Sequence, residues 1–515
     1  MLNFTSALNL IAPLPALLFV GLALWQRYRP LRWHVSEQAS LLAFASVAVA
    51  LGLSLSYRPS LAADLWIEAS PLRLTVLTLV AFLGAVLLRY SARHLAGDPK
   101  AGQFHSNLLL TLASVSLVVV SNHLLILLAA WTAISLSLHQ LLLFYPERPR
   151  ALLAAQKKFI LARLAEIALL VAFSLLAWQH DSWLLSEINQ QVKTDGLTVA
   201  GQIAAVLIAL AALVKCAQMP VHGWLIQVVE APTPVSALLH AGIINLGGFL
   251  LILFAPLLQQ AALAQGFVLV VAGLTTVLAS LVMGTRISAK VRLAWSTSAQ
   301  MGLMLVECAL GLYELALLHL VAHACYKAHA FLNAGEEVLS HVQRRRVPAA
   351  VFSPGLWLGV AGLMMLVVGL GHAWLAPDTA LSPWLLLGFS MTVLLVEGRH
   401  NDRFGNLARI VVGLPILLGA YVMQARGSAL MLESSQPAPV ADLWIVSLWL
   451  GFGVLAALAK GNATSRWIVH FRESLYAGFY LDEWFTRATL KCWPRALRLR
   501  GQTAQRPQFS QESSS

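Results

Sequence analysis

The feature that most constrains this sequence is a series of apolar blocks, each close to the roughly 20 residues that a helix needs to cross a bilayer. Only 11% of the 515 residues are charged, against about 25% in soluble domains, so the chain could not cover its surface in water. Lipid is therefore the solvent, and in lipid a helix satisfies its own backbone. We predict an all-α polytopic membrane protein with about 14–15 transmembrane helices.

The apolar blocks define about fifteen predicted spans. They lie near residues 7–26, 39–57, 70–88, 105–120, 123–144, 159–178, 199–230, 234–255, 266–284, 293–311, 314–333, 353–374, 383–397, 408–425 and 442–460. Residues 461–500 are amphipathic and rich in aromatics, which suits an interfacial helix or a docking surface for a partner. Residues 501–515 are polar, and we expect them to be disordered.

Basic residues gather in alternate loops between the predicted spans. They are Arg27, Arg29, Arg32, Arg89, Arg93, Lys100, Arg148, Arg150, Lys157, Lys158, Arg286, Lys290, Arg292, Arg344, Arg345 and Arg346. The opposite loops hold Asp64, Glu68, Asp181, Glu187, Asp195 and Asp378. Because cytoplasmic loops are enriched in lysine and arginine, we predict an N-terminus outside and a C-terminus in the cytoplasm. The same bias accounts for the net charge of +12 without a nucleic-acid partner.

One predicted span, 199–230, is too long for a simple helix and carries Pro220 in mid-segment. Proline removes a backbone donor and clashes with the preceding turn, so we expect the helix to break there. Lys215 lies just before the break in an apolar run, where an unpaired lysine costs roughly 3 kcal/mol. Broken helices beside an ionisable residue recur in secondary transporters. The pattern therefore favours a functional Lys215 over a lysine that snorkels to the interface.

Further along the chain, His319, His323 and Lys327 are spaced by four residues. This spacing stacks them on one helix face over roughly 12 Å. Histidine titrates near neutral pH, so such a ladder, bridged by water, suits a proton relay. The structural alternative is a hydrogen-bonded seam between helices. His240, which lies mid-span soon after the break, joins the same candidate path.

Acidic partners are scarce within the predicted spans. Arg163 and Glu166 are three residues apart and can pair on one helix face. Glu307 lies mid-span and is a candidate counter-ion for the histidine ladder. The four cysteines show no metal-ligand spacing, and the sequence has no P-loop, HExxH or GxSxG motif. We therefore predict a transporter subunit without a metal, cofactor or active site of its own.

Two regions resemble the antiporter-like subunits shared by respiratory complex I and the Mrp sodium/proton antiporters. They are VKCAQMPVHGWLIQVVEAPTPVSALLHAG, and KVRLAWSTSAQMGLMLVECALG followed by LHLVAHACYKAHAFLNAG. The resemblance covers roughly residues 105–400 and implies two inverted five-helix repeats, 105–255 and 266–397, between N-terminal helices (1–104) and C-terminal helices (408–460). It implies an ion path through Lys215, His240, His319, His323 and Lys327, supported by Arg163 and Glu166.

Two positions depart from that family's pattern. Thr132, in AAWTAISLSLHQ, stands where the family has the glutamate that pairs with the first lysine. Lys215 then needs another acid, for which Glu166 is the candidate, or works with a shifted pKa. The later broken helix usually holds a lysine or glutamate, whereas the 353–374 span offers only His372 and no clear proline break.

Within this family, HGWLIQVVEAPTPVSALLHAGIINLGGF and YAGFYLDEWFTRAT look most like DabB proteins, the membrane subunits of two-component inorganic carbon systems. The resemblance implies a multi-pass protein of the bacterial inner membrane with a large peripheral cytoplasmic partner, DabA. That partner is zinc-dependent and related to β-carbonic anhydrases. Proton or sodium flow through the membrane subunit would drive CO₂ hydration or bicarbonate delivery by the partner, which would also hold the zinc.

Two other functions stay open at this point. One is a subunit of an Mrp-type antiporter, or of an ion-pumping NADH or ferredoxin dehydrogenase. The other is a membrane anchor that conducts nothing, which the loss of a carboxylate at Thr132 favours.

Overall fold

The computed structural model describes residues 4–30, 32–57, 65–335, 354–375, 381–397, 439–460 and 465–492. In its first half the helices are α1 (Phe4–Ile11), α2 (Leu14–Tyr28), α3 (Trp33–Tyr57), α4 (Pro71–His94), α5 (Ala101–Val120), α6 (Leu124–Leu142), α7 (Pro149–His180), α8 (Leu185–Asp195), α9 (Val199–Lys215), α10 (Gly223–Gln227), η1 (Val228–Glu230), α11 (Thr233–Ala241), η2 (Ile243–Asn245) and α12 (Leu246–Leu253). They continue as α13 (Ala255–Gln260), α14 (Ala262–Met283), α15 (Ala289–Ala309), α16 (Tyr313–Leu332), α18 (Pro354–Leu375), α19 (Ser382–Glu397), α21 (Pro439–Lys460), α22 (Arg466–Tyr476), η3 (Gly478–Tyr480) and α23 (Glu483–Cys492).

The predicted all-α membrane fold is confirmed. Within the described ranges, 11 helices are long and apolar enough to cross a membrane, and α9 is a shorter apolar helix that leads into a break. Every predicted span other than 408–425 coincides with a helix or a broken helix. The 408–425 span, the polar end at 501–515, and the basic residues Arg344, Arg345 and Arg346 lie outside the described residues.

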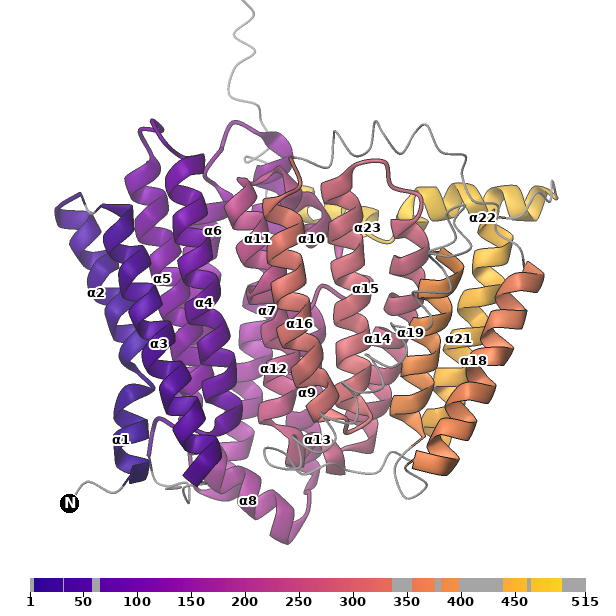
Figure 1. Cartoon of the computed structure of the whole chain (residues 1–515), viewed down its shortest axis with the longest axis horizontal. Helices are drawn as coiled ribbons and strands as arrows, with labels where there is room; N and C mark the ends of the chain where they lie inside the picture. The colour runs from indigo at the N-terminus through magenta and orange to yellow at the C-terminus, as the bar shows by residue number, and fades with distance from the viewer. Residues whose placement is uncertain are drawn as a thin grey trace, which may run out of the picture.

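The spans run side by side, and α22 lies across one end of the bundle (Figure 1). We call this end the α22 face, where α10 and α23 also lie, and the opposite end the α8 face. In the first repeat α5 starts at the α22 face, whereas in the second repeat α14 starts at the α8 face. The first helices of the two predicted repeats therefore run in opposite directions.

The start of α7 differs from the sequence-based expectation. Lys157 and Lys158 were predicted to lie in a basic loop before a span at 159–178, but both lie inside α7 and are buried. Proline is favoured at the first position of a helix, and Pro149 starts α7 a turn or more earlier than the charges suggested. Arg148 and Arg150 remain at the α22 face.

Loops at the α8 face are joined by short backbone pairings. Ile67 bridges Ser121, and His123 bridges Leu184; apart from these isolated bridges the described residues form no β-structure. Arg73, at the start of α4, connects the loops of this region through its side chain. Its side chain is 2% exposed, pairs with Glu68 at 3.2 Å, and donates to the carbonyl oxygens of Val119 at 3.0 Å and Ser121 at 2.7 Å.

We therefore predict that Arg73→Met destabilises the protein by about 3–5 kcal/mol, because it leaves Glu68 and two carbonyl groups unpaired. Arg89→Met is the matched control. Arg89 is 65% exposed and lies 3.8 Å from Glu37, an arrangement that contributes less than about 1 kcal/mol. Melting of the purified protein in detergent measures both variants, and equal melting temperatures would contradict the role of Arg73.

Candidate ion path

The helix break predicted near Pro220 is present and is held by neighbouring helices. Helix α9 ends at Lys215, and α10 begins only at Gly223. The Ser298 hydroxyl of α15 donates to the carbonyl of Ala217 at 2.8 Å. The backbone N–H of Met219 donates to the Thr275 hydroxyl of α14 at 3.1 Å. Unwound backbone at membrane depth must be satisfied by protein or water, and here α14 and α15 do so.

Lys215 does not have a carboxylate as its direct partner. Its ammonium lies 4.5 Å from the centre of the Trp131 ring, the residue before Thr132. Arg163 and Glu166 form the predicted pair, with Nη2 and Oε1 2.7 Å apart. The Glu166 carboxylate and the Lys215 ammonium form no direct ion pair, but their charges interact electrostatically. A cation over an aromatic ring is only partly compensated, so Lys215 remains a charge in need of an acid.

Lys158 of α7 also lies in this region, although the sequence analysis did not predict it as part of the ion path. Its ammonium donates to the Ser135 carbonyl at 2.6 Å and to the Ser135 hydroxyl at 3.2 Å. Arg163 donates to the same hydroxyl at 2.8 Å. We call Trp131, Ser135, Lys158, Arg163, Glu166 and Lys215 the Lys215 group. It contains three cations and one carboxylate.

A second cluster forms where α11, η2, α15 and α16 meet. His319 and Glu307 are 3.0 Å apart, so the predicted acid is present beside the histidine ladder. The ring centres of His319 and His323 are 6.2 Å apart, which places them on one face of α16 as predicted. His323 Nδ1 lies 3.1 Å from Asn245 Oδ1 in η2, an interruption that the sequence analysis did not foresee.

The other two basic residues of this cluster contact α15. Lys327 donates to the carbonyl of Leu293 at 3.1 Å and also bonds the Ser296 hydroxyl. His240 Nδ1 lies 3.1 Å from the Thr297 hydroxyl. We call His240, Glu307, His319, His323 and Lys327 the His323 group. The Nε2 atoms of His240 and His323 are buried without a protein partner, so each ring keeps one nitrogen free to exchange a proton with water.

The two groups are joined through the break and α15. Gln218, in the broken segment, donates to the carbonyls of Cys216 at 2.8 Å and Ser298 at 3.3 Å, and its own oxygen has no protein partner. Ser298 follows Thr297, which contacts His240. A line of polar groups therefore runs from Lys158 past the half-buried Lys215 to Gln218, which bonds the carbonyl of the residue after Lys215, and on to the His323 group. Most of its members are buried, and we call it the buried line.

His372, predicted as a supporting charge, lies elsewhere. It packs edge-on against Trp384 of α19, with ring centres 6.2 Å apart, and its helix α18 is continuous and contacts α19 and α21. In the part of the chain that the structure describes, no three histidine, cysteine or acidic side chains are grouped to hold a metal ion.

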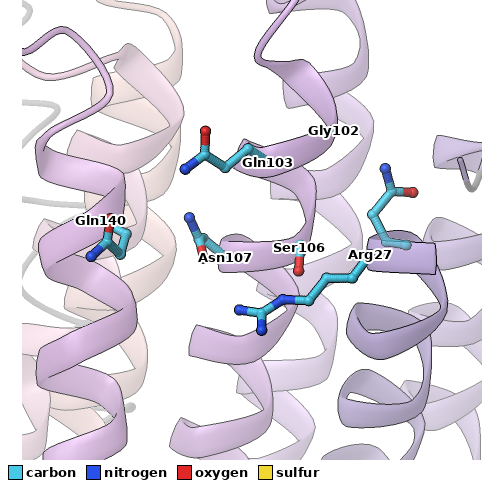
Figure 2. Close-up of a pocket in the computed structure, with 7 residues that line it drawn as sticks. Arg27, Gly102, Gln103, Ser106, Asn107 and Gln140 are labelled. Carbon is cyan, nitrogen blue, oxygen red and sulfur yellow. The ribbon is translucent and has the colours of Figure 1, made fainter. Parts of the chain in front are cut away.

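A separate cavity of about 630 Å³ lies at the α22 face between α2, α5 and α6. Figure 2 shows Gln103 and Asn107 on α5, with Gln140 on α6 and Arg27 reaching from α2 past Ser106. Its lining has one charged side chain, Arg27, and contains no member of either group. It therefore does not belong to the buried line.

Comparison with known proteins relates this geometry to a family. Residues 121–353 match the family described as "NADH:quinone oxidoreductase/Mrp antiporter, TM". The chain is 48% identical over 493 residues to "Probable inorganic carbon transporter subunit DabB" of Hydrogenovibrio crunogenus, which covers 95% of each protein. It is 35% identical over 444 residues to "Probable inorganic carbon transporter subunit DabB2" of Halothiobacillus neapolitanus, which covers 83% of this chain and 80% of that protein.

Two solved structures share the fold at low sequence identity. The Mrp complex from Dietzia sp. gives a TM-score of 0.62 and 21% identity over 95% of this chain and 60% of that chain. The archaeal membrane-bound sulfane sulfur reductase gives a TM-score of 0.59 and 16% identity over 94% of this chain and all of that chain. These likenesses show an antiporter-like membrane fold.

The packing of α14 on α15 beside the break yields a prediction. A Cβ atom at Gly302 would lie 2.5 Å from Thr276 Oγ1 and 2.7 Å from the carbonyl of Ala272. We expect Gly302→Ala to separate these helices and to cost about 1–3 kcal/mol. Gly266→Ala on α14, where a Cβ would meet nothing within 4 Å, is the control. If both variants melted at the wild-type temperature, the close packing beside the break would be wrong.

Proposed function

This chain belongs to the DabB family of inorganic carbon transporter subunits, and from that premise we propose that it conducts protons to drive carbon uptake by a partner subunit. The observation that carries the proposal is the buried line from the Lys215 group to the His323 group. Its members are lysines, histidines and a few carboxylates, which are groups that can bind and release protons.

The charge of the line favours protons over sodium ions. The Lys215 group holds three cations against one carboxylate, and at low dielectric these cations would repel a bound sodium ion. Sodium also prefers several oxygen ligands, whereas the line offers mainly nitrogen atoms. A proton needs no such cage, because it moves between nitrogen atoms and water.

We place the α22 face in the cytoplasm. The described basic residues at this face include Arg27, Arg29, Arg32, Arg89, Arg93, Lys100, Arg148, Arg150, Arg286, Lys290 and Arg292. The α8 face carries Asp181, Glu187 and Asp195, with Lys193 as its exposed basic residue near α8. This asymmetry is the one that the positive-inside rule predicts for a bacterial inner-membrane protein.

The partner that fits this placement is a peripheral cytoplasmic protein of the DabA kind. Zinc chemistry on CO₂ or bicarbonate would take place in that partner, and this chain would supply the proton flow. Helices α22 and α23 carry exposed aromatic side chains at the same face, including Trp467, Tyr476 and Trp484. Co-purification of a zinc-containing protein with the full chain tests this part of the proposal.

Conduction through the line predicts a growth defect. We expect Lys215→Ala and His323→Ala each to reduce carbon-dependent growth at ambient CO₂ by about tenfold or more, the scale of losing a proton-transfer group. His329→Ala is the control, because His329 is exposed on another face of α16. Growth equal to wild type in both variants, with normal expression and partner binding, would support the non-conducting anchor instead.

The identity of the ion is tested separately. We expect a proton uncoupler to abolish carbon uptake by cells, because it removes the gradient that drives proton flow. Replacing sodium with potassium in the medium should leave uptake unchanged. Loss of uptake in sodium-free medium, with the proton gradient intact, would identify sodium as the conducted ion.

A further inference from the structure

The segment after the last span folds back to deliver one carboxylate to the bundle. Between α22 and α23 the chain turns through Gly478, Phe479 and Tyr480, with φ angles of +68°, +57° and +55°. The left-handed conformation costs free energy at a non-glycine residue. The side chains of Leu475 and Phe485 on either side are buried and offset this cost. Asp482 lies two residues after Tyr480.

The Asp482 carboxylate contacts side chains of α7 and α10, two helices that lie far from it in the sequence. Its Oδ2 atom lies 2.7 Å from the Lys157 ammonium, and Gln227 donates to the same oxygen at 3.1 Å. Lys157 is 0% exposed, so this carboxylate is its counter-ion. The Asp482 side chain fills the space beside Gly223, where a Cβ atom would lie 1.6 Å from Oδ1. Glycine at position 223 is therefore required for Asp482 to reach Lys157.

A cavity of about 390 Å³ lies beside Asp482 at the α22 face. Its lining includes His222, Gln227, Arg286, Trp295 and Asp482. Four buried polar atoms of these residues have no protein partner: Asp482 Oδ1, His222 Nδ1, Gln227 Oε1 and Arg286 Nε. Buried polar atoms are normally satisfied, and several facing one polar cavity suit it to hold water.

We propose that this cavity is the α22-face port of the proton path, with Asp482 as its acid and Lys157 as its first lysine. The inference rests on the proposed function. The C-terminal segment thereby supplies a carboxylate to Lys157, one lysine of the first repeat, in which Thr132 replaces the family's glutamate. Lys158, the residue after Lys157, belongs to the Lys215 group and interacts electrostatically with Lys215.

Protons that enter at the α8 face leave through this port in three steps. The Lys157 ammonium gives a proton to the Asp482 carboxylate, and both side chains are then neutral. The Asp482 acid gives its proton to a water molecule in the cavity, which leaves as hydronium, and the carboxylate is restored. The Lys157 amine then takes a proton from the line, where Lys158 is the next residue, and the ion pair is restored. One proton has left the line, and Asp482 and Lys157 have returned to their starting charges.

An ion pair that only stabilises the fold would have the same geometry, so the test must separate a structural role from proton transfer. Asp482→Asn alone leaves a buried lysine unpaired, which strongly destabilises the protein and can unfold the segment. The double variant Lys157→Gln with Asp482→Asn removes both charges and keeps two hydrogen-bonding side chains of similar size. If the ion pair only stabilises the fold, the double variant restores carbon uptake. If the pair transfers protons, the double variant does not restore uptake.

The experiment uses the full chain with its partner and measures carbon uptake by cells, melting temperature and co-purification of the partner. We expect the double variant to melt near wild type and to bind the partner, but to lose uptake by about tenfold or more. Glu473→Gln, an exposed acid of α22 that pairs with His470, should keep full uptake.

Wild-type uptake by the double variant would overturn the port. Lys215→Ala is measured alongside to separate this failure from failure of the proposed function. If Lys215→Ala loses uptake while the double variant keeps it, only the port is wrong. If both keep wild-type uptake, proton conduction by this line is wrong as well.

Discussion

The structure depends on how it satisfies an unwound stretch of backbone inside the membrane. Residues 216–222 form no helix, and a lipid environment offers no hydrogen bonds to them. Ser298 and Thr275 supply the bonds from α15 and α14. This requirement brings α15 against the broken helix, and α15 also carries the contacts of His240 and Lys327. The break and the two groups of charges are therefore parts of one packing arrangement.

The second constraint is a shortage of acid. Burying a cation without a partner costs several kcal/mol, yet the Lys215 group has one carboxylate for three cations. The chain relieves this by other means: an aromatic ring under Lys215, the carbonyl and hydroxyl of Ser135 for Lys158, and Asp482 for Lys157. This arrangement underlies our proposal that the line conducts protons and not sodium ions.

Features set by local sequence could be predicted. The spans follow from apolar length, the break from Pro220, and the shared face of His319 and His323 from helical spacing. Arg163 and Glu166 pair because they are three residues apart on one helix. In each case the physical cause lies within a few residues of its effect.

Features set by distant contacts could not be predicted. Lys157 and Lys158 resembled loop charges, because burial of a lysine depends on partners from other helices. Asp482 lies 325 residues from Lys157 in the sequence, and no spacing rule relates them. The interruption at η2 contains no proline, and His372 packs on Trp384 instead of joining the line.

The most direct measurement of the central claim is proton flux through the purified complex in liposomes that contain a pH-sensitive dye and no sodium. Under an imposed pH gradient, with CO₂ supplied, the account predicts flux well above that of protein-free liposomes. It also predicts that liposomes with the Lys215→Met complex behave like protein-free ones. Carbon turnover by the wild-type complex without any proton flux above that background would contradict the account.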